Sequence, residues 1–185
     1  PRASSQARPD SYDEGIKSLA VAYWNNIGMY GQPKLHGTGV GEPTGAVYRS
    51  WSTGAPTGLG VTDKWSARLT GEVLMPSTGS YTFRIYSDDG ARLIVDDQLL
   101  IDDWADGPRS RDAPVTFTAS ANTWHRIRLE YYENTGDARL ELHWMTPGTT
   151  SSTAVPGANL RPSYGLPTTV TDTAGSSSKV TRTEY

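Results

Sequence analysis

Short runs of alternating apolar and polar residues constrain the fold of this chain more than any other feature of its sequence. β-Branched and aromatic residues alternate with polar ones in Trp65–Val73, Tyr81–Tyr86 and Trp124–Tyr132, and Gly, Pro, Asp and Asn separate the runs. A two-residue period is typical of strands with one buried face. No stretch keeps a period of 3.6 residues, which argues against a helical domain and against a parallel α/β fold.

Seven or more short strands recur at intervals of about ten residues, a spacing typical of an antiparallel sandwich or barrel. The predicted strands cover residues 19–24, 65–73, 81–86, 92–95, 98–101, 115–119, 124–132 and 138–144. Residues 25–60 are rich in Gly and Pro with scattered aromatics, and we expect long ordered loops there. The sequence therefore predicts an all-β fold, an antiparallel β-sandwich or barrel with long ordered loops.

Charge and composition narrow the possible partners. The 185 residues carry a formal net charge of −3, with no basic cluster to neutralise phosphates, so no nucleic-acid partner is expected. There is no cysteine, which excludes disulfides and thiol chemistry. No apolar run approaches the roughly 20 residues of a membrane-spanning helix, so no membrane insertion is expected. Because the sequence starts at Pro1 and not Met, we expect a monomeric module excised from a larger chain.

The domain organisation is predicted from changes in composition. Residues 1–15 are polar and contain Pro and Gly, as a linker would, and residues 16–148 carry the strand pattern. Residues 149–185 are predicted to be a second linker and the start of a possible repeat region. Within them, residues 164–172 and 179–185 read as two strands around a turn at 174–177.

Three adjacent aspartate pairs occur within a short stretch of the chain. Asp96-Asp97 lies between two apolar half-strands, where Asp tolerates a tight turn. Asp102-Asp103 ends a strand and is read as a solvated strand terminus or a local cap. Asp88-Asp89 differs because it interrupts two strands that could otherwise be continuous, and Gly90 supplies conformational freedom beside it. Only this pair is a candidate for two carboxylates that converge on one point.

The chemistry of such a pair favours a cation over catalysis. Glycosidase carboxyls lie about 5–9 Å apart on separate strands, a geometry that adjacent residues fit poorly. Two hard oxygen donors suit calcium, which takes 6–8 oxygens. A second oxygen-rich loop, residues 133–137, separates two later strands. Each loop is also consistent with an ordinary polar turn.

Several motifs together resemble the PA14 domain family. The matching text is found over residues 16–148 in one order, and its most specific element is Ser87-Asp88-Asp89-Gly90. The other matching segments are Asp63–Gly71, Thr78–Phe83, Ala91–Asp96, Ile101–Trp104 and Gly136–Trp144. The resemblance implies a β-sandwich or barrel, in agreement with the strand pattern.

The resemblance also implies a calcium site. In lectin members of the family, two adjacent aspartates joined by a cis peptide hold Ca²⁺, and a later loop completes the shell. Carried over to this chain, the metal ligands are Asp88, Asp89, Asn134, Gly136 and Asp137, with a cis peptide between the first two. The sugar-binding set implied is Asp88, Asp89, Asn134 and Asp137, with Trp104 and Arg109 near it. The acid-and-amide loop after position 132 is the feature that favours a lectin.

The function expected from this site is calcium-dependent carbohydrate binding by a non-enzymatic module of a secreted or cell-surface protein. The expected ligands are neutral hexoses or fucose, whose vicinal hydroxyls would complete the calcium shell. Two alternatives stay open: a structural or protein-contacting PA14 spacer, and an accessory domain of a glycosidase. The C-terminal piece, with Tyr164 and Thr183–Tyr185, resembles the start of YD-type (Rhs-like) repeats.

Most of the other residues that could bind a ligand or catalyse a reaction are expected to have structural roles. His36, His125 and His143 show no spacing typical of zinc. Three tryptophans in or beside strands are expected in the core: Trp65, Trp124 and Trp144. Trp104 or Tyr132 could stack on a sugar face, with core packing as the alternative, and Arg109 and Arg111 are placed in a loop that could reach a sugar hydroxyl.

Overall fold

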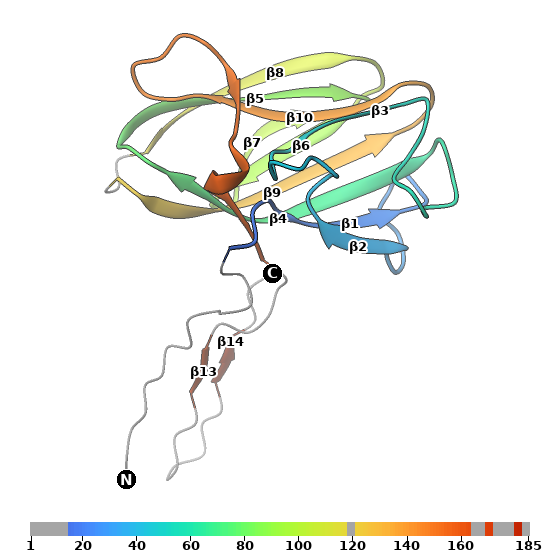
Figure 1. The fold of residues 1–185 in the computed structure, drawn as a ribbon, viewed down its shortest axis with the longest axis horizontal. Coiled ribbons are helices and arrows are strands. Elements are labelled where there is room, and N and C mark those ends of the chain that lie inside the picture. Colours follow the sequence, from blue (N-terminus) through green and yellow to red (C-terminus); the bar gives the residue numbers. More distant parts are fainter. Residues whose placement is uncertain (1–14, 118–120, 164–168, 172–179, 183–185) are drawn as a thin grey trace.

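A computed structural model describes residues 15–117, 121–163, 169–171 and 180–182 of the chain. The strands between residues 20 and 162 form a sandwich of two antiparallel sheets, as the alternating pattern predicts (Figure 1). The predicted linker at residues 1–15 lies almost entirely outside the described residues. Within the described part of the chain, no helix has the length and apolar character needed to cross a bilayer.

The larger sheet has seven strands. Its main path runs through β2 (Leu35–Thr38), β1 (Ala20–Trp24), β4 (Trp65–Met75), β9 (Thr123–Glu133), β6 (Ala91–Val95) and β7 (Gln98–Asp103). The seventh, β12 (Leu160–Pro162), pairs with β4 at Gly71–Val73, just beyond the part of β4 that pairs with β1.

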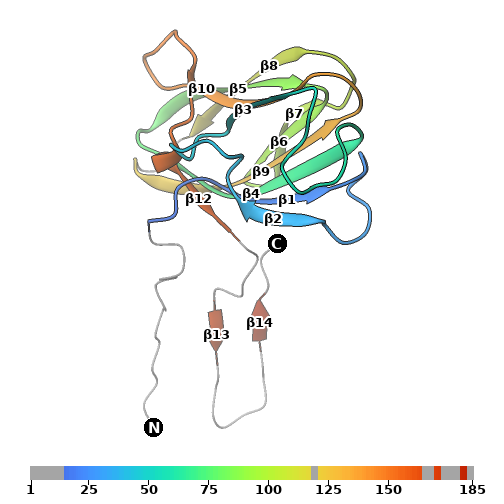
Figure 2. The ribbon, with the colours of Figure 1, turned by 45° about the vertical axis from the view of Figure 1, so that its right-hand side comes forward.

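The smaller sheet has five strands and covers the larger one (Figure 2). Its main path runs through β11 (Thr153–Ala154), β10 (Ala138–Met145), β5 (Gly79–Asp88) and β8 (Arg109–Phe117), while β3 (Tyr48–Ser52) pairs with β10. A separate two-stranded sheet, β13 (Thr169–Thr171) with β14 (Val180–Arg182), matches the strand pair predicted in the C-terminal segment.

The core lies between the two sheets and is built from the apolar face of each strand. Tyr81, Phe83 and Ile85 of β5 face Leu129 and Tyr131 of β9, and all are at most 2% exposed. At one end of the core, aromatic rings pack edge to face, with 5.0 Å between the centroids of Trp51 and Trp65. The alternation read from the sequence is therefore the buried face of the sandwich.

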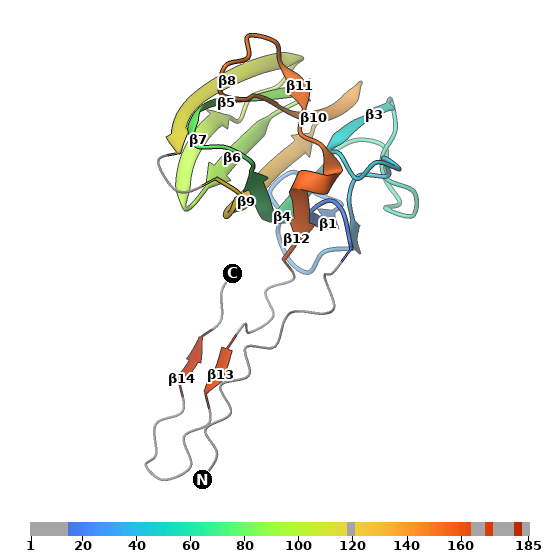
Figure 3. The same ribbon diagram turned by 60° about the vertical axis from the view of Figure 1, so that its left-hand side comes forward.

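The structure corrects the domain boundary expected at residue 148. The segment after β10 forms β11, a short 3₁₀-helix η1 (Gly157–Asn159) and β12, and it crosses from the smaller sheet to the larger one (Figure 3). Val155 and Leu160 are 0% and 1% exposed. The packed domain thus extends to Pro162, because Val155 and Leu160 belong to the buried core and β12 pairs with β4.

Other expectations need smaller corrections. The region expected to be loops at residues 25–60 contains the edge strands β2 and β3, whose side chains are mostly exposed and so lack the buried alternation. Strand β8 begins at Arg109, which places Arg109 and Arg111 in a strand and not in a loop. Trp65 and Trp144 are core residues, as predicted, but Trp124 is only half-buried and lies under the Arg161 guanidinium, 4.2 Å from its ring centroid.

Candidate functional site

The two oxygen-rich loops of the sequence meet at one end of the sandwich. Strand β5 ends at Asp88 and β9 ends at Glu133, so the loops that follow these strands project from the same end. The loop between β7 and β8, residues 104–108, reaches this end as well, through hydrogen bonds to both of the other loops. Three connections therefore enclose one site.

Asp88 and Asp89 form the centre of this site. The peptide bond between them is cis, as the resemblance implied. Asp89 is only 3% exposed, whereas Asp88 is half-buried. Burial first, then the charges of Asp89 and Asp137 and a hydrogen bond to Asp89, raise the pKa of Asp88 above its usual value. The two carboxyl groups thus converge at one point, where their negative charges oppose each other.

Gly90 is required at this turn for a reason that differs from the predicted one. Its φ is not in the left-handed region, so conformational freedom is not what selects glycine here. A Cβ at this position would lie 2.3 Å from Cε1 of the Tyr132 ring and 2.9 Å from the backbone nitrogen of Ala105. Glycine is needed because the turn passes directly against these two groups.

The loop after β9 is bonded to the aspartate pair. The backbone N–H of Asn134 donates to Oδ2 of Asp89 at 2.7 Å, and the Asp137 carboxylate is close enough to raise the pKa of Asp88. The N–H of Gly136 donates to Oδ1 of Asp63 at 3.2 Å. The structure therefore brings Asn134 and Asp137 beside Asp88 and Asp89, while Gly136 lies in the same loop as Asn134 and Asp137 and is bonded to Asp63.

Asp106, in the loop between β7 and β8, was missed by the sequence reasoning. Its Oδ1 accepts a hydrogen bond from the Tyr132 hydroxyl at 2.6 Å, and its Oδ2 accepts one from Nδ2 of Asn134 at 2.9 Å. These two bonds lower the pKa of Asp106 below its usual value, and the bond from Tyr132 has the larger effect. The next residue, Gly107, donates its N–H to Oδ1 of Asp89 at 2.5 Å. An Asp-Gly pair in a loop reads as a turn, so sequence alone offers no signal for this role.

Glu133 is a second residue that the sequence reasoning left out of the site. It is 0% exposed, and its pKa rises from 4.5 to about 8, first because of burial and then because of the Asp89 and Asp88 charges. Its Oε2 accepts a hydrogen bond from the Tyr131 hydroxyl at 3.4 Å, while its Oε1 has no hydrogen-bond partner among the described residues. Burial and the neighbouring Asp89 and Asp88 charges therefore favour the protonated form of Glu133, which adds no negative charge of its own near neutral pH.

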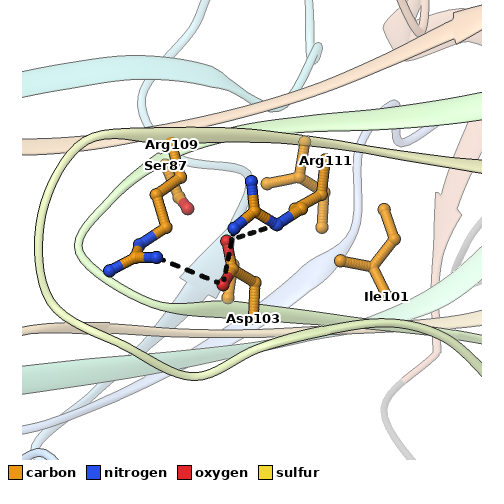
Figure 4. A pocket seen from close by; sticks show the side chains of 7 residues that line it. Ser87, Ile101, Asp103, Arg109 and Arg111 are labelled. Atoms are coloured by element: carbon orange, nitrogen blue, oxygen red, sulfur yellow. Dashed lines mark hydrogen bonds and ion pairs between the residues drawn. The ribbon is translucent and has the colours of Figure 1, made fainter.

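The site residues expected to contact sugar beside the carboxylates are held in place by protein contacts. Trp104 packs against Tyr132, with 4.7 Å between ring centroids, and the Arg92 guanidinium lies 4.4 Å from the Trp104 ring centroid. Arg109 and Arg111 both point to the Asp103 carboxylate, at 3.8 and 3.2 Å (Figure 4). Arg109 also donates to the backbone oxygen of Asp106 at 2.5 Å, so it supports the loop that holds Asp106. A direct contact of Trp104 or Arg109 with sugar stays a prediction.

The residues at this end fit a calcium ion in the chemistry of their donors. They supply carboxylate, amide and backbone oxygens, which are the ligands calcium prefers. Burial is the larger cause of the raised pKa of Asp88, and the neighbouring Asp89 and Asp137 charges, which a cation would neutralise, add to it. Among the described residues, no three His, Cys, Asp or Glu side chains lie close enough together to hold a metal. A shell built on Asp88 and Asp89 would therefore need the Asn134 amide, backbone oxygens and a closer approach of the Asp137 carboxylate.

The other two aspartate pairs make contacts within the sheets, but Asp103 is not the solvated strand terminus or local cap that was expected. Asp96 and Asp97 form the turn between β6 and β7 and pair with His125 and Arg126, at 2.6 and 2.5 Å. Asp102 pairs with Arg92 across the sheet at 2.7 Å. Asp103, whose side chain is only 12% exposed, pairs with Arg111 and with Arg109, the residue that supports the Asp106 loop.

A comparison with known proteins agrees with this geometry. The family model described as "PA14 domain" matches residues 17–158, which is most of the chain. The chain belongs to the PA14 domain family. This assignment agrees with the two-sheet fold and with the position of the cis Asp88-Asp89 bond between β5 and β6.

Relatives of this PA14 domain are parts of larger proteins. The chain is 31% identical over 115 residues to the anti-sigma-I factor RsgI3 of Acetivibrio thermocellus, a match that covers 62% of this chain and 18% of that protein. It is 28% identical to an anti-sigma factor domain-containing protein from Clostridium clariflavum, with a TM-score of 0.71, covering 80% of this chain and 47% of that one. The chain spans less than half the length of both proteins.

A third similar structure shares the fold. It is described as the PA14 sugar-binding domain from an RTX adhesin, and it is 17% identical with a TM-score of 0.61. The match covers 80% of this chain and 99% of that domain. At this identity the likeness concerns the fold alone.

Proposed function

We propose that this PA14 domain is a calcium-dependent carbohydrate-binding module without enzymatic activity. Asp88, Asp89 and Asp137 would hold one Ca²⁺ together with the Asn134 amide oxygen and a backbone carbonyl near Gly136. The observation that carries the proposal is the convergence of the Asp88 and Asp89 carboxyl groups beside the loop that contains Asn134 and Asp137.

The site has the properties that sugar recognition through an ion requires. Asn134 is half-buried and Asp137 is exposed, so a ligand can reach the rim while Asp89 stays buried beneath it. Bound calcium, which takes 6–8 oxygens, would offer its open positions to two vicinal hydroxyls of a neutral sugar. The description of the RTX adhesin domain as sugar-binding supports the same class of ligand.

The expected affinity of one site is low. The Arg92 guanidinium already lies over the Trp104 ring, and Arg109 is engaged with Asp103 and Asp106, so few side chains are free to add contacts. A sugar held mainly by two hydroxyls on an ion would bind weakly, and several modules or copies would be needed for tight attachment. Such a module fits a secreted or surface-exposed protein.

A second role for the same binding activity is favoured by the relatives. Two of them are named as anti-sigma factors, and this domain matches only part of each. We infer that the domain could equally serve as the ligand-binding portion of a larger regulatory protein. The binding site and its chemistry would be the same in either setting.

A glycan array tests the proposed function. The chain is applied in calcium and again in EDTA, and we expect binding to neutral glycans with exposed vicinal diols only in calcium. Deoxy analogues that lack one hydroxyl of the diol should compete far more weakly than the parent sugar. Binding that is equal in EDTA, or an equal effect of the deoxy sugar, would exclude coordination through the ion. A calcium-binding domain that binds no glycan would instead favour the protein-contacting spacer.

A further inference from the structure

Asp106 lies between the Tyr132 hydroxyl and the side-chain amide of Asn134, and it contacts both. The residue is exposed, yet both carboxylate oxygens are engaged, Oδ1 by the Tyr132 hydroxyl and Oδ2 by Nδ2 of Asn134. Tyr132 itself is only 5% exposed and packs against Trp104. A carboxylate held by a rigid aromatic residue provides a fixed reference point for the asparagine side chain.

The hydrogen bond between Asp106 and Asn134 determines whether the nitrogen or the oxygen of the Asn134 amide faces Asp106. An ionised carboxylate only accepts hydrogen bonds, so the amide group facing it must be the NH₂ donor. The amide oxygen is on the same carbon and is therefore turned away from Asp106. Within the described part of the chain, that oxygen accepts no hydrogen bond.

The backbone of Asn134 is held by two hydrogen bonds, so only its side chain is left free to change orientation. Its N–H is bonded to Oδ2 of Asp89 at 2.7 Å, and its carbonyl oxygen accepts a hydrogen bond from the N–H of Lys64 at 3.1 Å. With the backbone fixed on both sides, rotation of the amide decides whether oxygen or nitrogen is offered to a cation. Only the oxygen can bind calcium.

We propose that Asp106 is a positioning residue for calcium, which fixes the Asn134 amide so that its oxygen and not its nitrogen is available to the ion. This inference rests on the proposed calcium site. It assigns Asp106 a role through Asn134 and not as a direct ligand, consistent with the loop geometry in which Gly107, and not Asp106, contacts Asp89.

The same loop couples the two halves of the site. Gly107 donates to Oδ1 of Asp89, while Arg109 donates to the backbone oxygen of Asp106 and pairs with Asp103. Displacement of this loop would therefore loosen Asp89 and Asn134 together. Outer contacts that orient metal ligands typically change metal affinity by about 10- to 100-fold when they are removed.

The test is a double-mutant cycle on the full chain, with calcium affinity measured by isothermal titration calorimetry. Asp106→Ala is made in the parent protein and in Asn134→Asp. A carboxylate at position 134 presents an oxygen in either orientation, so it does not need Asp106 to orient it. We expect Asp106→Ala to weaken calcium binding by about 10- to 100-fold in the parent. In the Asn134→Asp background we expect little loss, or a gain from relief of repulsion between two acids.

The background dependence separates orientation from simple charge. If Asp106 acted only through its negative charge, its removal would weaken calcium binding equally in both backgrounds, and that result would overturn the proposal. Unchanged affinity of Asp106→Ala in the parent would overturn it as well, with the calcium site itself intact. Absence of calcium binding by the parent would contradict the calcium site and this inference together.

Two further variants complete the design. Asp112→Ala removes an exposed acid that pairs with Arg84 away from the site, and its calcium affinity should match the parent. If Asp106→Ala proves unfolded in EDTA by circular dichroism, Asp106→Leu replaces it in the same cycle, since it keeps a branched side chain of similar shape but offers no hydrogen-bond acceptor. The side-chain amide resonances of Asn134 in ion-free protein should shift in either Asp106 variant and stay unchanged in Asp112→Ala.

Discussion

The dipeptide Asp-Asp occurs in two tight turns of this domain, at Asp88-Asp89 and at Asp96-Asp97, and its surroundings differ between them. At Asp96 and Asp97 both residues are exposed, and their carboxylates contact the His125 ring at 2.6 Å and the Arg126 guanidinium at 2.5 Å. At Asp88 and Asp89 the carboxyl groups converge with each other, and the nearest charges, including that of Asp137, are also negative. The first pair is electrostatically satisfied by the protein, whereas the second is not.

The difference lies in what surrounds each pair and not in the pair itself. The Asp96-Asp97 turn projects from an edge hairpin, where both residues have positive φ and are exposed. The Asp88-Asp89 turn lies under two other loops, which donate the N–H groups of Gly107 and Asn134 to Asp89. Backbone donors hold an acid in place without neutralising its charge, so a cation can still bind there.

Removal of Asp89 should produce the largest effect on this contrast. Asp89→Ala takes away one proposed ligand and leaves the N–H groups of Gly107 and Asn134 without their acceptor, a loss of about 1–3 kcal/mol. We expect the calcium-dependent rise in melting temperature to disappear, as measured by differential scanning fluorimetry in calcium and in EDTA. The matched control is Asp97→Ala, which should keep the full calcium response. Equal responses in Asp89→Ala and parent would contradict the assignment.

A methyl group at the turn should produce the next largest effect. Gly90→Ala would place a Cβ 2.3 Å from the Tyr132 ring and 2.9 Å from the backbone nitrogen of Ala105. Forced overpacking of this kind costs about 1–3 kcal/mol of unfolding free energy, which urea denaturation in EDTA would measure. Gly37→Ala is the control, since its Cβ would come no closer than 3.8 Å to Val21 and its backbone φ is unstrained. A stability loss no larger than that of Gly37→Ala would show that the turn can relax.

The pH dependence of stability should also distinguish the two regions. Glu133 has a folded-state pKa of about 8 against 4.5 in an unfolded chain, so between these values the ion-free folded state binds more protons than the unfolded state. The contribution of Glu133 to stability should therefore be fully present below about pH 4.5 and should be lost as pH rises toward 8. The raised pKa of Asp88 acts in the same direction.

Calcium and a neutral replacement should each reduce this slope. Saturating calcium would favour the ionised acids, and Glu133→Gln would remove the group with the larger shift. Urea denaturation at a series of pH values in EDTA measures the effect. A stability that rises with pH over this range in the ion-free parent would show that Glu133 and Asp88 are not crowded as the structure indicates.

The smallest effect is expected at the satisfied pair. Asp97→Ala removes an ion pair whose Arg126 and Asp97 side chains are 50% and 78% exposed. Exposed pairs contribute about 0–1 kcal/mol, so the change in unfolding free energy should stay within that range. A loss of unfolding free energy well above 1 kcal/mol would mean that the Asp97 side chain contributes more to stability than an exposed ion pair does.

The strands of the core could be predicted from sequence because their signal is local. Alternation in Tyr81–Tyr86 and Trp124–Tyr132 reflects burial on one face, and the structure confirms those strands. Strands β2, β3 and β11 could not be predicted, because they are short edge strands with mostly exposed side chains. Their pairing is set by the neighbouring strand and not by their own residues.

The candidate site divides in the same way. Asp88, Asp89 and the loop after β9 stand out because their residue types and positions match a family motif. Asp106 and Glu133 do not stand out, since an Asp-Gly turn and a strand-terminal Glu are common in any β protein. Their importance arises from contacts between loops that are distant in sequence, such as the bond between Asp106 and Asn134.

A crystal structure of the chain grown in calcium, with anomalous diffraction data, tests the central claim most directly. We expect one calcium peak bounded by Asp88, Asp89, Asn134 and Asp137, and no peak at Asp96 and Asp97. Addition of a binding sugar should place two of its hydroxyl oxygens on the same ion. An empty Asp88-Asp89 site at a saturating calcium concentration, or a peak at the Asp96-Asp97 turn instead, would contradict the account.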